Sequence, residues 1–361
     1  MPKLILDTMG GDHAPHAVLE GAIRALPELE GELVLIGDSE VLKPVLARRR
    51  YRALAEALAG SSPWPRCKVS LIHASQTIEM DDSIRAIRKK PNASINVGCD
   101  LASRTYKDSA AAAFVSAGHS GAIMTAALLT MGRLARVERP AIAVKLPTLS
   151  PDGCVLIDVG ANVDCKPEHL RDFALMGTLF SQVERKSPHL PRIGILSNGE
   201  ERKKGNELTR ASATLIENVS SFTTGKAGSP NAIGEFIGYV EGKEIFKGAV
   251  DVVVTDGFVG NVVLKSIEGL GAAVMTVAKK DAKRSIFAPL GFLLAASVFR
   301  RLKRRLDYAE YGAAPLLGVA GYAFICHGRS NPKAIKNALL RAQTALRGQL
   351  IERLEAALEH A

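Results

Sequence analysis

Aromatic residues and paired cysteines are scarce in this chain. Aromatic residues make up only 5% of the sequence, and the arginines at positions 48, 49, 50 and 52 flank a single aromatic residue, Tyr51. A base-stacking platform for nucleic acid is therefore not expected. The five cysteines form no CxxC pair, and no charged segment followed by an apolar one precedes Leu4. We therefore expect no disulfide framework, no secretion and a reducing cytoplasm.

The signatures of nucleotide and metal binding are also missing. Neither a Walker P-loop nor a GxGxxG directly after a predicted strand occurs in the sequence. His13 and His16 flank Ala14-Pro15 without forming a ligand cluster with other residues. Lone histidines are usually structural, so we expect neither a metal nor a cofactor.

Apolar residues and positive charge are abundant. The chain has 361 residues, of which 47% are hydrophobic, enough for a large core or for two lobes that share one sheet. Its formal net charge of +10 indicates an anionic partner. Nucleic acid, an anionic membrane, an acidic protein and an acidic metabolite all satisfy that requirement, and charge alone does not choose among them.

Short apolar runs alternate with Ala- and Leu-rich helical stretches along the chain. The runs are continuously apolar, as in strands whose two faces are both covered. The alternation predicts an α/β fold with a doubly wound, largely parallel sheet. The expected strands are residues 3–7, 32–38, 68–73, 111–116, 141–148, 154–160, 192–198, 250–257 and 321–328.

No stretch is typical of a linker, and no fixed-period repeat is present. We therefore expect one α/β domain over residues 1–330, with a bilobed arrangement left open and an insertion at about 281–308. Asn331-Pro332 predicts the start of a C-terminal helix, residues 331–361, that packs on the same domain.

Three predicted strands end in an aspartate followed by glycine. The segments are LILDTMGGD, VLIDVGAN and VVVTDGFVGN, and their aspartates are Asp7, Asp158 and Asp256. Ligands of open α/β sheets bind beyond the carboxyl ends of the strands, where glycines let backbone amides approach. The pattern predicts that the three aspartates lie at one rim. The alternative is that each one caps a turn or a helix.

The segment Gly118-His119-Ser120-Gly121-Ala122 lies between a predicted strand and a predicted helix. It nearly matches the nucleophile elbow GxSxG of α/β-hydrolases, and Asp256 and His327 follow in the order that fold requires. The final glycine of the motif is missing, however. The same segment also fits a glycine-rich anion cradle at a helix N-terminus, and local sequence leaves both interpretations open.

A second polar segment, LSNGEERKKGNELT, follows the predicted strand at 192–198. It holds Lys203 and Lys204 between glycines, where flexible ammonium groups suit a phosphate or a carbonyl dipole. Taken alone, the segment is more typical of a solvated loop than of a binding site.

Taken together, these segments resemble a known family. DTMGGDHAP, IEMDDSIRAIRKK, SAGHSGAIMTA, ERPAIA, LIDVGANVDCKPEHL, SNGEERKKGNELT, DVVVTDGFVGNVVLKSIEG and YGAAPLLGV occur in this order. They resemble the hallmark segments of the bacterial phosphate acyltransferase family PlsX, up to about Ser330. A set of ordered segments is far more specific than any single motif.

The resemblance implies transfer of a fatty acyl group from acyl carrier protein to inorganic phosphate, giving acyl phosphate for phospholipid synthesis. It also implies a homodimer with a fold similar to isocitrate and isopropylmalate dehydrogenases. By motif position, the implied catalytic residues are Lys204, Asn261 and Asp256. The implied phosphate- and substrate-binding residues are Asp7, Gly10, Gly11, Asp12, Ser116, Gly118, His119, Ser120, Asp158, Asn162 and Lys203.

The chain departs from the family pattern at His119-Ser120, where the family usually has Asn-Thr. The departure leaves the phosphate contacts open. A serine hydrolase or thioesterase that uses Ser120, Asp256 and His327 therefore stays open as an alternative function.

An apolar segment near the C-terminal third, SIFAPLGFLLAASVF, is followed by a run of basic residues. It is shorter than the roughly 20 residues of a spanning helix, and Pro289 interrupts it. It is typical of an interfacial element that binds anionic lipid reversibly, which predicts a cytoplasmic enzyme at the inner face of the cell membrane. The expected contacts are Phe287, Leu290, Phe292, Leu293, Leu294, Val298, Phe299, Arg300 and Arg301.

Three alternatives stay open for this segment. It could form a buried helix pair at a dimer interface, or its arginines could dock acidic acyl carrier protein. It could also be the main feature of a non-catalytic module that binds lipid or carrier protein.

Overall fold

The computed structural model describes residues 2–107, 112–223, 232–282, 297, 308–310 and 312–359. The predicted membrane-binding residues lie outside the described ranges, namely Phe287, Leu290, Phe292, Leu293, Leu294, Val298, Phe299, Arg300 and Arg301.

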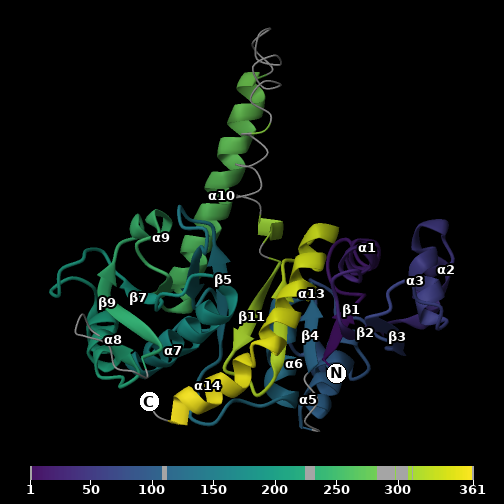
Figure 1. Ribbon diagram of the computed structural model, residues 1–361, viewed down its shortest axis with the longest axis horizontal. Coiled ribbons are helices and arrows are strands. Elements are labelled where there is room, and N and C mark those ends of the chain that lie inside the picture. Colours follow the sequence, from purple (N-terminus) through teal and green to yellow (C-terminus); the bar gives the residue numbers. More distant parts are fainter. Residues whose placement is uncertain are drawn as a thin grey trace.

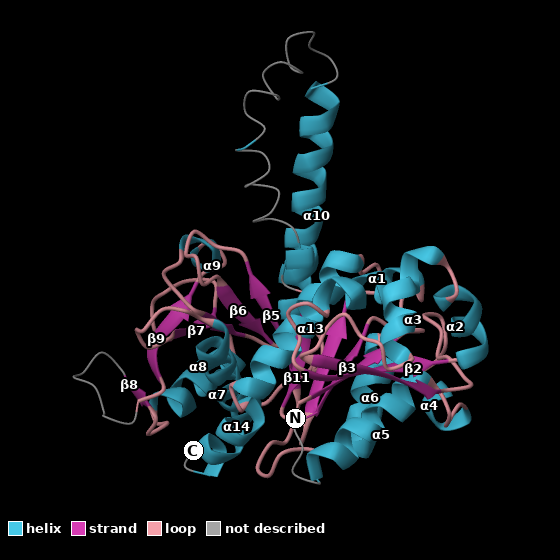
Figure 2. Cartoon of the chain, turned by 45° about the vertical axis from the view of Figure 1, so that its right-hand side comes forward, coloured by secondary structure: helices cyan, strands magenta, loops and turns pink. Residues whose placement is uncertain are grey.

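A mixed sheet of 12 strands forms the centre of the molecule, in the order β3-β2-β1-β4-β12-β11-β5-β6-β10-β7-β9-β8. Figure 2 shows this sheet with helices on both of its sides. The strands are β1 Lys3–Asp7, β2 Gly31–Gly37, β3 Cys67–His73, β4 Ala112–Ser116, β5 Ala141–Leu146, β6 Cys154–Ile157, β7 Arg192–Leu196, β8 Phe222–Thr223, β9 Gly234–Val240, β10 Val252–Val254, β11 Ala313–Leu317 and β12 Tyr322–Cys326.

The sheet consists of two parallel halves that run in opposite senses. Strands β3, β2, β1, β4 and β12 are parallel to one another, and so are β6, β10, β7, β9 and β8. Between the halves, β11 is antiparallel to both β12 and β5, and β5 is antiparallel to β6. The prediction of a largely parallel α/β sheet is confirmed.

The twist of the sheet counteracts this reversal. Six steps separate β1 from β10, and adjacent strands rotate by roughly 20–25°, which accumulates to roughly 120–150°. A common rim requires this twist to turn the carboxyl ends of the two halves, antiparallel by pairing, back toward the same side.

Both faces of the sheet are covered, which explains why the strands are continuously apolar. Alternate residues of β1 point to opposite faces. Leu4 and Leu6 belong to one buried cluster and Ile5 to another. The helices are α1 His16–Ala25, α2 Ser39–Leu46, α3 Arg52–Leu58, α4 Ala86–Lys89, α5 Ser94–Lys107, α6 Ser120–Thr130, α7 Pro167–Glu184, α8 Glu207–Glu217, α9 Glu244–Lys247, α10 Gly257–Ala282, α13 Pro332–Arg347 and α14 Leu350–Glu359, with 3-10 turns at Arg49–Tyr51 and Tyr308–Glu310.

The C-terminal region forms two helices rather than the single helix predicted. The Asn331 side chain accepts a hydrogen bond from the Ala334 amide at 3.0 Å and so caps α13 as expected. The helix ends at Gly348, and Gln349 adopts a left-handed φ of 50°. That conformation breaks the helical path, so α14 takes a new direction and packs against α7.

Helix α10 projects away from the body of the molecule (Figure 1). Its 26 residues make it roughly 39 Å long. Over Gly257–Ala278 it is long and apolar enough to cross a membrane, with a mean hydropathy of 1.4, and 6% of the most apolar window is buried. The first turn of α10 lies against the end of β6, where Gly260 approaches the Asp158 carbonyl.

Candidate active site

Asp7 ends β1 and is completely buried. Ser116, the last residue of the neighbouring β4, donates a hydrogen bond from Oγ to Asp7 Oδ2 at 2.7 Å. The same Oγ accepts a bond from the Gly118 amide at 3.0 Å. Burial raises the pKa of Asp7, and the hydrogen bond from Ser116 acts against that rise. Through Ser116, the Asp7 carboxyl group therefore fixes the turn that follows β4.

The glycines after β1 permit a close approach of three loops. A Cβ on Gly10 would lie 2.6 Å from both Asp7 Oδ2 and the Gly118 nitrogen, so a side chain does not fit there. Gly11 has a φ of 100°, which favours glycine. The Asp12 amide donates to the Gly328 carbonyl at 2.9 Å, which ties this loop to the end of β12.

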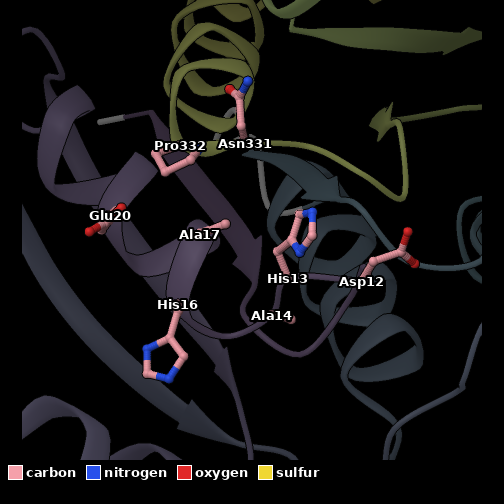
Figure 3. A pocket seen from close by; sticks show the side chains of 8 residues that line it. All are labelled: Asp12, His13, Ala14, His16, Ala17, Glu20, Asn331 and Pro332. Atoms are coloured by element: carbon pink, nitrogen blue, oxygen red, sulfur yellow. The ribbon is translucent and has the colours of Figure 1, made fainter.

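A pocket of about 430 Å³ opens beside this loop, between the first turn of α1 and the start of α13 (Figure 3). The lining residues are Asp12, His13, Ala14, His16, Ala17, Glu20, Asn331 and Pro332. His16 also contacts the buried Tyr51, with 2.9 Å between Nδ1 and the phenol oxygen.

His119 caps α6. Its ring Nδ1 accepts a hydrogen bond from the Ala122 amide at 3.2 Å, which is the capping role that an asparagine side chain performs elsewhere. The substitution at this position thus preserves the helix start. Ser120 is the first residue of α6 and is exposed. The backbone amides that follow Gly118 form a helix N-terminus, which suits an anion.

The residues of the candidate hydrolase triad follow three different strands. Asp256 follows β10 and His327 follows β12, and four strand steps separate these two strands. At about 4.8 Å per step the strand axes are roughly 19 Å apart. Asp256 Oδ1 instead accepts a hydrogen bond from the Val259 amide at 2.9 Å and caps α10. The described partner of the Asp256 carboxylate is thus a backbone amide of its own helix.

Asp158 organises a second cluster, at the end of β6. Its Oδ1 accepts hydrogen bonds from the Ile142, Gly160 and Ala161 amides at 3.0, 3.2 and 3.1 Å. Its Oδ2 accepts two bonds from Asn162, from the backbone N at 2.8 Å and from Nδ2 at 2.9 Å. Burial raises the pKa of Asp158, whereas these donors lower it. With both oxygens occupied, Asp158 shapes the loop.

Asn162 connects that loop to the start of α10. Its Nδ2 also donates to the Pro140 carbonyl at 2.7 Å, and its own carbonyl accepts a bond from the Gly257 amide at 2.7 Å. Asp158 and Asp256 therefore belong to one group of contacts on the adjacent strands β6 and β10.

Asn261 lies on the first turns of α10 and is exposed. A Cβ placed on Gly160, where φ is 141°, would lie 3.9 Å from Asn261 Cγ. A Cβ on Gly260 would overlap the carbonyl oxygen of Asp158. The absence of side chains at these two glycines lets the Asp158 loop approach Asn261 closely.

Lys203 and Lys204 lie in an exposed turn between β7 and α8. The Lys204 amide donates to the Glu201 carbonyl at 2.9 Å, and the stem of Lys204 passes Gly199.

Leu208, on the first turn of α8, shares a shallow pocket of about 370 Å³ with residues of the second cluster. The lining residues are Val163, Asp164, Cys165, Leu208, Asp256, Phe258 and Val259.

The predicted site residues thus form two groups. Asp7, Gly10, Gly11, Asp12, Ser116, Gly118, His119 and Ser120 lie in the half of the sheet around β1 and β4, and Asp158, Asn162, Asp256 and Asn261 lie around β6 and β10. Contacts join Asp158 to the loop after β10 and join Asp7 to the turn after β4. A common rim for all three aspartates stays a prediction.

Sequence reasoning missed the ion pairs that hold the far end of the Asp158 loop. Glu138 contacts Lys166 Nζ at 3.3 Å and His169 Nε2 at 3.2 Å. His169 Nδ1 in turn accepts a bond from the Lys166 amide at 3.1 Å. Lys166 and His169 lower the pKa of Glu138. The segment ERPAIA carried the only signal, since no spacing rule pairs residues 138 and 169.

No group of three or more His, Cys, Asp or Glu side chains suited to a metal occurs in the described part of the chain. The groups at the two loop clusters include backbone amides, the Asn261 carboxamide and the ammonium groups of Lys203 and Lys204.

Comparison with known proteins decides the family. Residues 2–353 match the family described as fatty acid synthesis protein. The chain belongs to this family. A phosphate acyltransferase of Geotalea uraniireducens is 43% identical over 358 residues, covering 98% of this chain and 94% of the relative. One of Heliobacterium modesticaldum is 44% identical, covering 98% of this chain and 96% of the relative.

These relatives confirm the expected acyltransferase and enzyme class over the hydrolase and the binding module. Two solved structures confirm the predicted α/β fold class of this family member. The EutD phosphotransacetylase from Staphylococcus aureus has a TM-score of 0.53 at 14% identity, covering 96% of this chain and 94% of that structure. A phosphotransacetylase from Streptococcus pyogenes has a TM-score of 0.52 at 16% identity, covering 97% and 94%.

Proposed function

We propose that this enzyme transfers a fatty acyl group from acyl carrier protein to inorganic phosphate and releases acyl phosphate for phospholipid synthesis. The observation that carries the proposal is near full-length similarity to phosphate acyltransferases, with the segments that resemble this family gathered at two loop clusters.

The reaction requires little base catalysis. Inorganic phosphate is already anionic near neutral pH, so one of its oxygens attacks the thioester carbonyl carbon directly. The carbonyl oxygen becomes an oxyanion, and its collapse breaks the carbon–sulfur bond and releases the carrier thiolate, which takes up a proton from water. An anion cradle and an oxyanion donor are the main requirements.

The exposed residues near the loop clusters supply these groups in our proposal. The amides at the start of α6, with Lys203 and Lys204, hold phosphate, and Asn261 donates from Nδ2 to the oxyanion. The buried Asp7 and Ser116 position the α6 turn, and Asp158 positions Gly160 beside Asn261. Asp256 fixes the first turn of α10 by capping it.

The first test measures release of carrier thiol from palmitoyl acyl carrier protein, with and without phosphate, with hydroxylamine to trap acyl phosphate. We expect phosphate-dependent release and a trapped product. Asn261→Ala should lower kcat by about 10²-fold or more, as loss of an oxyanion donor does elsewhere. Lys265→Ala, on the next turn of the same helix, is the matched control and should leave kcat unchanged. Release of free fatty acid without phosphate would contradict the proposal.

We further propose a homodimer formed through α10. Val263, Ile267, Leu270, Val274 and Val277 alternate spacings of four and three residues, the repeat of a coiled-coil seam. Leu270, Val274 and Val277 are 67%, 54% and 58% exposed, so the outer half of the seam is open to a second copy. Leu270→Glu should convert the dimer to a monomer in sedimentation equilibrium, whereas an unchanged mass would refute this interface.

We also propose that the enzyme is cytoplasmic and that residues 285–301 hold it at the inner face of the membrane. In this proposal residues 1–330 form one catalytic domain, and residues 331–361 pack on that domain. Deleting residues 287–299 should abolish binding to anionic liposomes while thiol release from soluble carrier protein continues. Undiminished liposome binding would contradict the attachment.

A further inference from the structure

The segment between β3 and α5, residues 76–93, presents an apolar and a basic surface side by side. Met80 and Ile84 are 45% and 52% exposed. Arg85, Arg88 and Lys89 are also exposed, and none of the three forms an ion pair with another described side chain. Large apolar residues next to cations are typical of an interaction surface.

The segment is held firmly from inside. Lys90 Nζ bonds to Asp82 Oδ2 at 2.6 Å and to the Thr77 carbonyl at 2.9 Å, closing the loop. Asn96 Nδ2 donates to the Ile87 and Lys90 carbonyls, both at 2.9 Å. Because these bonds fix the backbone, the surface side chains are presented on a rigid support, which lowers the entropy cost of binding.

The same segment lies against the anion cradle. A Cβ on Gly121, in the first turn of α6, would be 3.4 Å from Ile84 Cδ1. A Cβ on Gly328, at the end of β12, would be 2.9 Å from Met80 Cε. His119 contributes to the lowered pKa of Asp82, after the larger effect of Lys90. A partner bound at residues 80–89 is therefore next to the turn that carries Ser120.

The charges on this surface are separated rather than mixed. The acidic Glu79 and Asp81 flank Met80, whereas the basic residues follow Ile84. Asp82 is neutralised internally by Lys90. The basic end thus favours an acidic partner, and the apolar centre favours one that also offers apolar contact.

We propose that Met80, Ile84, Arg85, Arg88 and Lys89, here called the β3–α5 surface, form the docking site for acyl carrier protein. This inference rests on the proposed function, in which an acidic carrier protein delivers the thioester. Arg85, Arg88 and Lys89 pair with carboxylates of the carrier, Met80 and Ile84 contact its apolar side chains, and the acyl arm enters beside α6.

The test compares two double charge reversals. Arg85→Glu/Arg88→Glu alters the β3–α5 surface, and Arg48→Glu/Arg49→Glu alters an equally exposed arginine pair on the turn before α3. We expect the first variant to raise Kd for holo carrier protein and KM for acyl carrier protein by roughly tenfold or more, with kcat at saturation unchanged. The control should change neither by more than about twofold.

A second variant guards against misfolding. Ile84→Ser removes apolar contact without changing charge, and it should also weaken carrier binding, by about threefold to tenfold, with an unchanged circular dichroism spectrum. In wild type, Kd should rise with salt more steeply than in Arg85→Glu/Arg88→Glu.

The outcomes separate the two proposals. Unchanged Kd and KM in both surface variants, with normal wild-type turnover, would overturn the docking site and leave the acyltransfer intact. Loss of liposome binding at unchanged Kd would assign the surface to the membrane and equally overturn it. Absence of phosphate-dependent turnover in wild type would overturn the proposed function, whereas carrier binding would still report on the surface.

Discussion

The approach of α10 to the Asp158 loop makes two glycines of one helix respond oppositely to the same substitution. Gly260 lies where a Cβ would overlap the Asp158 oxygen and would be 2.9 Å from its carbonyl carbon. Gly269 is on the same helix with nothing within 4 Å of a Cβ. Replacing each with alanine therefore compares overlap with open space on a common background.

The expected magnitudes follow from these contacts. In Gly269→Ala the helix gains about 0.5–1 kcal/mol, because alanine loses less entropy than glycine on folding. In Gly260→Ala that gain is outweighed by about 1–3 kcal/mol or more of overpacking against backbone. Relief requires a movement on the order of 1 Å, and a misplacement of that size costs up to about 10²-fold in rate. Asn261 is the next residue, so kcat should fall accordingly.

The assay combines urea unfolding, followed by circular dichroism, with phosphate-dependent thiol release. Gly260→Ala should shift the unfolding midpoint downward and lower kcat, while Gly269→Ala should shift the midpoint upward and leave kcat unchanged. If Gly260→Ala matches wild type in both measurements, the loop does not rest on α10 as described, and the positioning of Asn261 by Asp158 is refuted.

Three further substitutions test the site. Asp158→Asn leaves at least two buried N–H donors without an acceptor and should lower the free energy of unfolding by about 2–6 kcal/mol. The control Asp164→Asn, at an exposed position, should change that free energy by less than about 0.5 kcal/mol. Equal stability of the two variants would contradict the five hydrogen bonds to Asp158. Because Lys166 and His169 lower the pKa of Glu138 below 4.5, its stabilising effect is present above that pH and is lost as pH falls through the folded pKa. Glu138→Gln should flatten the stability profile in that acid range, and an unaltered profile would exclude the pairing. Ser120→Ala should retain turnover within about tenfold, since the proposed chemistry needs no serine nucleophile; complete loss together with labelling by a serine-reactive probe would restore the hydrolase.

Much of the fold could be predicted from local sequence patterns, because strands that are covered on both faces need continuous apolar runs, which are easily recognised. The run KLILD became β1, and RIGILSN and VDVVVTDG contain β7 and β10. Three strands were missed, β8, β9 and β11. Strand β8 has only two residues, and β9 and β11 carry glycines or a proline in their segments, GEFIGYV and AAPLL. Their strand conformation depends on neighbours: β11 pairs with β12 and β5, which are distant in sequence.

The sequence alone determined the α/β class, the acyltransferase family and the residue types at the strand ends, because each is recorded in short segments. Only the tertiary structure decided which side chains are free to act. It placed Asp7 and Asp158 inside the protein as acceptors for backbone and serine donors, and it left Asn261 and Lys204 exposed. It also set the exposed Met80 and Ile84 against the turn of α6. The physical reason is that burial and hydrogen-bond partners arise between strands far apart in the chain, where sequence spacing carries no information.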